Sequence, residues 1–173
     1  MIPKINNILY ATDLSKNSAY AFRYALNSAE HHKAKIHILH VLENRQPQNS
    51  LLGGPYFQLS QAELDEAYSE RKRVAKEEIR KRLDDFCKRE LKNKPTSLKR
   101  VDSIQVIEGD PAGEILQKAD ELNADILILG SHGKGSLDHA FLGSVAEKVL
   151  QRIKLPIIIV PIPKETDITF SEI

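Results

Sequence analysis

The chain has 173 residues, of which 41% are hydrophobic and 28% charged, and a net charge of +1 at pH 7. This length suits one domain with a substantial core, and the near-neutral balance argues against a general nucleic-acid-binding protein, which usually carries a basic excess. No apolar run approaches the roughly 20 residues that span a bilayer, the first residues lack the order of a signal peptide, and a single cysteine, Cys87, excludes an internal disulfide. We therefore expect a cytoplasmic protein with neither a nucleic-acid nor a membrane partner.

Short apolar segments alternate with helical patterns along the chain. The expected strands are residues 5–11, 34–42, 101–108, 125–129 and 155–161. The expected helices are residues 18–32, 61–91, a segment that begins at Gly109-Asp110-Pro111, and residues 143–153. The segment 125–129 is apolar without interruption after its first residue, which is typical of a strand covered on both faces. The alternation predicts an α/β fold, with one open five-stranded parallel sheet, helices on both faces and right-handed crossovers.

Local signals also indicate where helices begin. Asp110 suits an N-cap and Pro111 the first helical position. After the first strand, Asp13 and Ser15 compete for the same capping role, because both side chains can accept a hydrogen bond from a free backbone N–H. Ser144 is expected to cap the last helix.

Two stretches fall outside the alternating pattern. Residues 44–60 contain Gly53-Gly54-Pro55 and many polar side chains, and they predict a long loop. Long loops inside compact domains are often lids or mobile segments, and this one could cover the site or face solvent. Residues 164–173 form a polar tail, so we expect one domain over residues 1–163 followed by a loosely held end.

Unusual residues follow the first and fourth expected strands. Open parallel sheets bind ligands beyond the carboxyl ends of their strands, where the strand order reverses. In a sheet of order 3-2-1-4-5, that point lies between strands one and four. Strand one ends in Ala11-Thr12-Asp13, strand four ends in Gly130-Ser131-His132-Gly133, and four of the eight glycines lie between residues 130 and 143. Glycine lets a backbone approach a ligand closely, and a helix beginning near Gly143 would offer free N–H groups, so this segment predicts a phosphate-binding loop.

Each of these residues has more than one interpretation. Asp13 could accept hydrogen bonds from ribose hydroxyls, hold a divalent cation that bridges phosphates, or only cap a helix. The glycines could form a plain strand-to-helix connection, although such connections are usually shorter. His132 is better interpreted as a loop residue near the ligand than as a catalytic base, because no partner for it is identifiable.

The spacing Gly130-x2-Gly133-x9-Gly143-Ser144 resembles the nucleotide-binding signature of the universal stress protein family, in its ATP-binding branch. Four further stretches are similar to the family's first strand, second strand, third-helix entry and closing strand. These are residues 8–15, 37–42, 108–111 and 155–160. The resemblance covers about residues 3 to 162.

The resemblance implies a Rossmann-like fold of the adenine nucleotide alpha hydrolase type, with strand order 3-2-1-4-5. It implies ATP, or AMP or ADP, as the ligand, with Mg²⁺ or Mn²⁺ on the phosphates and possible help from Asp13. Asp13 would approach the ribose and adenine, Val41 would meet adenine through its backbone, and the glycines with Ser144 would hold ribose and phosphates. The complete expected nucleotide-binding set is Ala11, Thr12, Asp13, Val41, Gly130, Ser131, His132, Gly133, Gly143, Ser144 and Val145.

The resemblance also implies a homodimer that pairs through the last strand. The residues of that strand are Ile157, Ile158, Ile159 and Val160, and such an apolar edge would otherwise be an aggregation hazard. The leading hypothesis is a nucleotide-binding stress-response or regulatory protein, in which ATP occupancy changes the dimer or the binding of a partner. The alternatives are a slow ATPase or nucleotidyl-transfer enzyme on the same loop, assisted by His132 or Asp13, and a purely structural dimeric adaptor.

Overall fold

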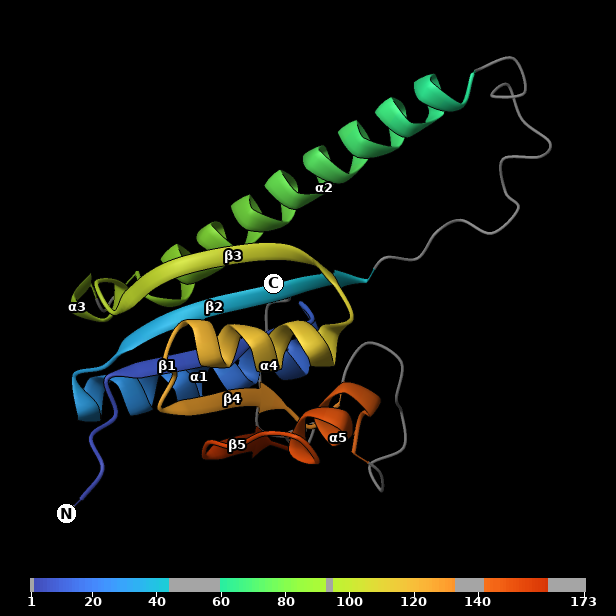
Figure 1. Ribbon diagram of the computed structural model, residues 1–173. Coiled ribbons are helices and arrows are strands. Elements are labelled where there is room, and N and C mark those ends of the chain that lie inside the picture. The colour runs from blue at the N-terminus through green and yellow to red at the C-terminus, as the bar shows by residue number, and fades with distance from the viewer. Residues whose placement is uncertain (1, 44–59, 93–94, 133–141, 162–173) are drawn as a thin grey trace.

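One parallel five-stranded sheet forms the centre of the molecule (Figure 1). The structure is a computed structural model that describes residues 2–43, 60–92, 95–132 and 142–161. The strands are β1 (Asn7–Ala11), β2 (Lys35–Glu43), β3 (Val101–Gly109), β4 (Ile126–Gly130) and β5 (Ile157–Val160). Their order is β3-β2-β1-β4-β5 and every neighbouring pair is parallel, so the predicted fold class and strand order are confirmed. The predicted loop up to residue 59 and the predicted tail lie outside the described residues.

Helices connect the strands. They are α1 (Lys16–His32), α2 (Gln61–Glu90), α3 (Pro95–Leu98), α4 (Pro111–Glu121) and α5 (Ser144–Leu150). The predicted start of α4 is confirmed, because the Asp110 side chain accepts a hydrogen bond from the Gly113 N–H at 2.9 Å and Pro111 is the first helical residue. The short α3 was not predicted, and α5 ends at Leu150, three residues before the expected end. None of the helices in the described ranges has the length and apolar composition that a membrane crossing requires.

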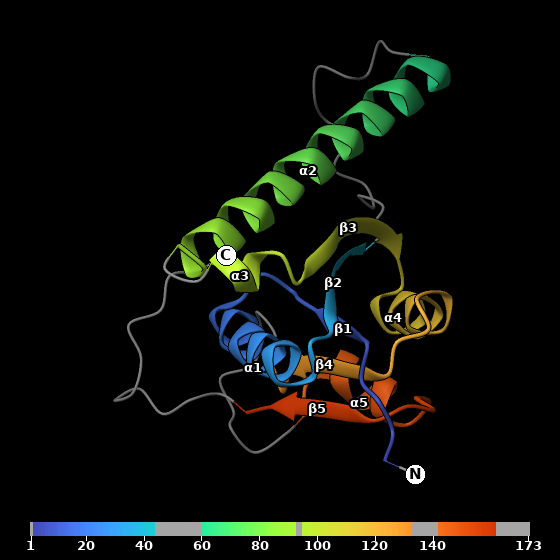
Figure 2. The ribbon, with the colours of Figure 1, turned by 90° about the vertical axis from the view of Figure 1, so that its left-hand side faces the viewer.

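The helices cover both faces of the sheet (Figure 2). In β1, Ile8 and Tyr10 point to the face that α1 and the end of α2 cover, whereas Leu9 and Ala11 point to the face of α4 and α5. All four side chains are buried, because β1 lies in the middle of the sheet and has helices on both sides. Alternate side chains along a strand point to opposite faces, so this single strand contributes to both cores.

Helix α2 packs against the domain mainly through its C-terminal part. Leu83, Phe86 and Cys87 are buried there, whereas the N-terminal part extends beyond the sheet (Figures 1 and 2). Lys72 and Lys76 hold the middle of the helix to the end of β3, with Nζ atoms 2.8 and 2.7 Å from the two carboxylate oxygens of Glu108. Hydrogen bonds from the two lysines lower the pKa of Glu108 below its ordinary value of 4.5.

We predict that Glu108→Gln loosens α2 near residues 72–76. Hydrogen exchange of these amides should be faster in the variant at pH 7, because the charged acceptor of both lysines is lost. The pKa of Glu108 is depressed in the folded chain, so its contribution is present above pH 4.5 and is lost as the pH falls through the folded value. Acidification should therefore loosen α2 in the unmodified chain more than in the variant, after correction for intrinsic exchange.

The matched control is Glu121→Gln, which removes the same charge from a Lys118–Glu121 pair that lies within α4. It should leave exchange in α2 unchanged. Equal exchange in α2 for the unmodified chain and for Glu108→Gln would show that the two lysines do not hold the helix.

Candidate functional site

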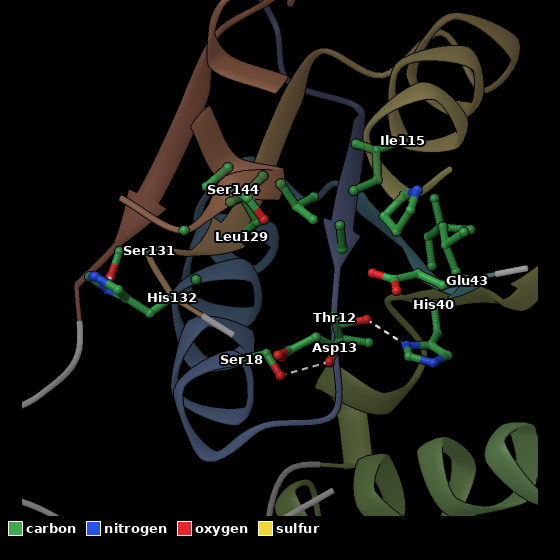
Figure 3. A pocket seen from close by; sticks show the side chains of 18 of the residues that line it. Thr12, Asp13, Ser18, His40, Glu43, Ile115, Leu129, Ser131, His132 and Ser144 are labelled. Atoms are coloured by element: carbon green, nitrogen blue, oxygen red, sulfur yellow. Dashed lines mark hydrogen bonds between the residues drawn. The ribbon is translucent and has the colours of Figure 1, made fainter. Parts of the chain in front are cut away.

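A cavity of about 680 Å³ opens at the carboxyl ends of the central strands (Figure 3). Its walls come from the ends of β1, β2 and β4 and from the starts of α4 and α5. The chain leaves β1 toward β2 and leaves β4 toward β5, so the cavity lies where the strand order reverses. This is the position at which open α/β sheets bind their ligands.

The cavity brings together the predicted site residues from three strands and one helix. Ala11, Thr12, Asp13, Val41, Gly130, Ser131, His132, Gly143, Ser144 and Val145 all line it. Gly133, the remaining predicted residue, lies outside the described residues. Residues that are more than a hundred positions apart in the sequence therefore line the same cavity, at the ends of the first and fourth strands, where the sequence predicted a site.

The turn after β1 is held by side-chain hydrogen bonds. The Thr12 hydroxyl lies 2.8 Å from the Ser18 hydroxyl and accepts a bond from the Leu14 N–H at 3.1 Å. Leu14 is buried and has φ of 68°, a left-handed conformation that is uncommon for a residue with a side chain. Such a conformation costs of order 1–3 kcal/mol and persists only where neighbouring contacts impose it.

Ser15, not Asp13, caps α1. The Ser15 hydroxyl accepts a bond from the Ser18 N–H at 3.2 Å. Asp13 supports this cap from outside, since its Oδ1 accepts bonds from the N–H and hydroxyl of Ser15 at 3.1 and 2.6 Å. Its Oδ2 is buried and has no hydrogen-bond partner among the described residues. Because a buried carboxylate oxygen without a partner is costly, this atom is a candidate acceptor for a ligand in the cavity.

Gly130 makes room for a side chain of α1. A Cβ atom at this position would lie 2.8 Å from Nδ2 of Asn17. That Nδ2 donates to the backbone oxygen of His132 at 2.9 Å, in a buried hydrogen bond that ties α1 to the end of β4. The absence of a side chain at Gly130 thus has a reason within the fold, besides the close approach to a ligand that the sequence suggested.

Ser131 and His132 turn their side chains away from the β1 wall. Figure 3 shows them together, on the side opposite His40. The Ser131 hydroxyl is 2.8 Å from Nδ1 of His132. The backbone of Ser131 also accepts from the Gly143 N–H and donates to the Val160 oxygen, both at 2.8 Å, so it links the end of β4 to the start of α5 and to β5.

Helix α5 begins at Ser144, and the expected capping role of Ser144 is wrong. Gly143 occupies the N-cap position, and within the described ranges no side chain caps the helix. Ser144 is already the first helical residue, so its hydroxyl does not serve as the cap of α5. The Ser144 side chain instead reaches the cavity, across from Thr12 and Asp13 (Figure 3).

Sequence reasoning missed nine residues that also line the cavity. They are Ser18, Leu39, His40, Leu42, Glu43, Pro111, Ile115, Leu129 and Ala146. Two signals would have found some of them. Leu39 shares a strand face with the predicted Val41, because alternate residues of β2 point the same way. Pro111 and Ile115 lie one helical turn apart at the start of α4, which a right-handed crossover brings to this edge of the sheet.

The described wall is divided by its chemistry. Leu39, Pro111 and Ile115 form an apolar part. Asp13 and Glu43 contribute two carboxylates at the ends of β1 and β2, and these would repel a phosphate placed beside them. A ligand with one apolar and one anionic end would therefore direct its anionic end away from both, toward Gly143 and Ser144.

We predict that Asn17→Ala and Gly130→Ala each lower the free energy of unfolding by about 1–3 kcal/mol, because each leaves the buried oxygen of His132 without its donor. In the double variant the new methyl group would occupy space that the Asn17 amide has left. The double variant should therefore lose no more free energy of unfolding than the more damaging single variant. Urea unfolding of all four proteins measures this. Losses that simply add would refute the contact.

Comparison with known protein families matches residues 4–161 to the sequence model of the universal stress protein family. The universal stress protein YxiE of Bacillus subtilis is 32% identical over 155 residues, which cover 90% of this chain and 98% of that relative. The universal stress protein MJ0577 of Methanocaldococcus jannaschii is 29% identical over 158 residues, which cover 88% of this chain and 93% of the relative.

Solved structures agree with these sequence matches. The structure of MJ0577, described as a hypothetical protein, has a TM-score of 0.73 at 25% identity and covers 94% of this chain and 100% of that one. A universal stress protein crystallised in complex with cAMP has a TM-score of 0.58 at 21% identity, covering 92% of this chain and 98% of that one, and so shares the fold. The family match over residues 4–161 confirms what the glycine spacing suggested: the chain belongs to the universal stress protein family.

Proposed function

We propose that this chain binds an adenine nucleotide in the cavity between β1 and β4, and acts as a dimeric regulatory or stress-response protein. The observation that carries the proposal is the buried Oδ2 of Asp13, which has no hydrogen-bond partner among the described residues and belongs to the cavity wall. A ribose hydroxyl is a neutral donor that would satisfy this oxygen, and an acidic residue plays that part in other nucleotide-binding α/β folds.

The rest of the ligand follows from the position of the ribose. Adenine would lie against the apolar part of the wall near Val41 and Ile115, where its flat face replaces water. The phosphates would extend away from Asp13 toward Gly130, Gly133, Gly143 and Ser144. The backbone N–H of Ser144 suits an anion there, because it lies at the start of α5, whereas the N–H of Gly143 is already bonded to the Ser131 oxygen.

The divalent ion in this proposal enters with the phosphates. Among the described residues, no group of three His, Cys, Asp or Glu side chains could hold a metal ion. Mg²⁺ often takes one or two carboxylates together with substrate phosphates and waters, and does not need a cage made only of protein. Asp13 is the side chain of the wall that would share such an ion if its Oδ2 does not bind ribose.

A relative supports the ligand class. The universal stress protein crystallised with cAMP has the same fold, and cAMP contains adenine, ribose and one phosphate. The candidate ligands to compare for this chain are therefore ATP, ADP, AMP and cAMP.

We predict that calorimetry detects binding of at least one of these four nucleotides, and that Asp13→Ala weakens the binding about tenfold or more, because a hydrogen bond to a charged group contributes about 1.5–3 kcal/mol. The control is Asp85→Ala, which removes an equal charge from an exposed position on α2. No binding of any of the four at millimolar concentration would refute the proposal. Equal binding by Asp13→Ala would refute the role of Asp13.

The dimer in this proposal uses the free edge of β5. In the described sheet β5 pairs only with β4. The backbone oxygens of Pro156 and Val160 accept bonds from the β4 side, so the intervening amides of Ile157 and Ile159 point to the open edge. An apolar edge with free N–H groups is a ready template for pairing with a second chain.

A hydrogen bond connects β5 to the cavity. The Ser131 N–H donates to the Val160 oxygen at 2.8 Å, and Ser131 also lines the cavity. A nucleotide that shifts Ser131 would therefore act directly on the end of β5. This contact supports regulation of the dimer by nucleotide occupancy. A ligand shifts an equilibrium between two conformations only when its contacts differ between them.

We predict that Ile159→Pro converts a dimer to a monomer in sedimentation experiments, because proline removes the outward N–H. Ile159→Val keeps that N–H and should remain dimeric. Far-UV circular dichroism would show that the proline variant is folded. A chain that is monomeric without substitution, or a folded proline variant that still dimerises, would contradict the assignment of the interface.

A further inference from the structure

His40 contacts the β1 turn at the point where the pairing of β1 and β2 ends. The last backbone bond between them runs from the Thr12 N–H to the Leu39 oxygen, at 2.9 Å. The oxygen of Thr12 is then bound by a side chain, since Nδ1 of His40 lies 2.7 Å from it in a buried contact. Figure 3 draws this bond across the cavity wall.

The partner of His40 determines which ring nitrogen carries a proton. A backbone carbonyl only accepts hydrogen bonds, so Nδ1 must be the donor. Protonation of the imidazole would keep this bond, because both nitrogens of the charged ring are donors. His40 is 8% exposed, which shields the bond from competing water.

The bonded oxygen belongs to the peptide unit that leads into Asp13. Its orientation therefore fixes where the Asp13 backbone starts, immediately before the left-handed residue Leu14. The hydroxyls of Thr12 and Ser18 hold the other side of this turn. A strained turn that must present one carboxylate oxygen needs support on both sides.

We propose that His40 is a positioning residue for nucleotide binding: its Nδ1–H holds the Thr12 carbonyl so that Asp13 presents Oδ2 to the ribose. This inference rests on the proposed function, and it assigns His40 a role that acts through Asp13. The imidazole itself need not contact the nucleotide.

The substitutions His40→Leu and His40→Asn separate positioning from packing. Asparagine places an N–H donor at the position of Nδ1, whereas leucine fills similar space without a donor. His40→Leu should bind ATP about tenfold more weakly than the unmodified chain, and His40→Asn should stay within about threefold of it. Melting temperatures of all variants would be measured alongside, so that a loss of binding can be compared with any loss of stability.

Two further arms test whether the effect passes through Asp13 and the ribose. In the Asp13→Ala background, His40→Leu should cause no additional loss of ATP affinity. With 2′,3′-dideoxy-ATP, which lacks the ribose hydroxyls, the unmodified chain and His40→Leu should bind almost equally. Hydrogen exchange of the Leu14 and Ser15 amides in the free chain should be faster in His40→Leu and restored in His40→Asn.

The outcomes distinguish this inference from the function on which it rests. If the unmodified chain binds none of the adenine nucleotides, both are overturned. If ATP binds and depends on Asp13, but His40→Leu binds as tightly as the unmodified chain, only the role of His40 is overturned. The same holds if leucine and asparagine weaken binding equally, or if the loss for His40→Leu persists with the dideoxy nucleotide.

Discussion

The parallel pairing of β1 with β4 is the contact on which the candidate site depends. In this ladder Ile8 pairs with Ile126 and Tyr10 with Ile128, and all four side chains are buried. The remaining strands lie outward on either side, with β2 and β3 beyond β1 and β5 beyond β4. The chain leaves β1 toward β2 and leaves β4 toward β5. Because these connections run in opposite directions, a cavity opens between the carboxyl ends of β1 and β4.

The two walls of the cleft are fixed in different ways. On the β1 side, side-chain hydrogen bonds from Ser18 and His40 hold a turn that includes a left-handed leucine. On the β4 side, Asn17 reaches from α1 beneath Gly130 and holds the backbone of His132. Both walls thus take support from α1, which places the acceptor of one wall at a set position relative to the backbone donors of the other. Such preorganisation lowers the entropy that binding must offset.

The sequence predicted the sheet because its strands and helices have local signatures. The apolar run at 125–129 marks a doubly covered strand, and Asp110-Pro111 marks a helix start, without help from distant residues. The choice between Asp13 and Ser15 as a cap could not be made from the residue types, because both side chains accept hydrogen bonds. In the structure Ser15 is the N-cap and Asp13 bonds to Ser15. The need for glycine at position 130 comes from Asn17 on α1. The role of His40 is visible only from its hydrogen bond to the Thr12 carbonyl, at the end of the neighbouring strand β1. Contacts of this kind depend on tertiary arrangement, which a motif does not contain.

Occupation of the cleft by an adenine nucleotide is the central claim, and native mass spectrometry of the chain after gentle purification tests it most directly. We expect a mass increment of one adenine nucleotide per chain, either carried through purification or restored by added nucleotide, and a smaller bound fraction when Asp13 is replaced by alanine. A chain that carries no nucleotide and gains no mass with ATP, ADP, AMP or cAMP would show that the cleft is not an adenine-nucleotide site.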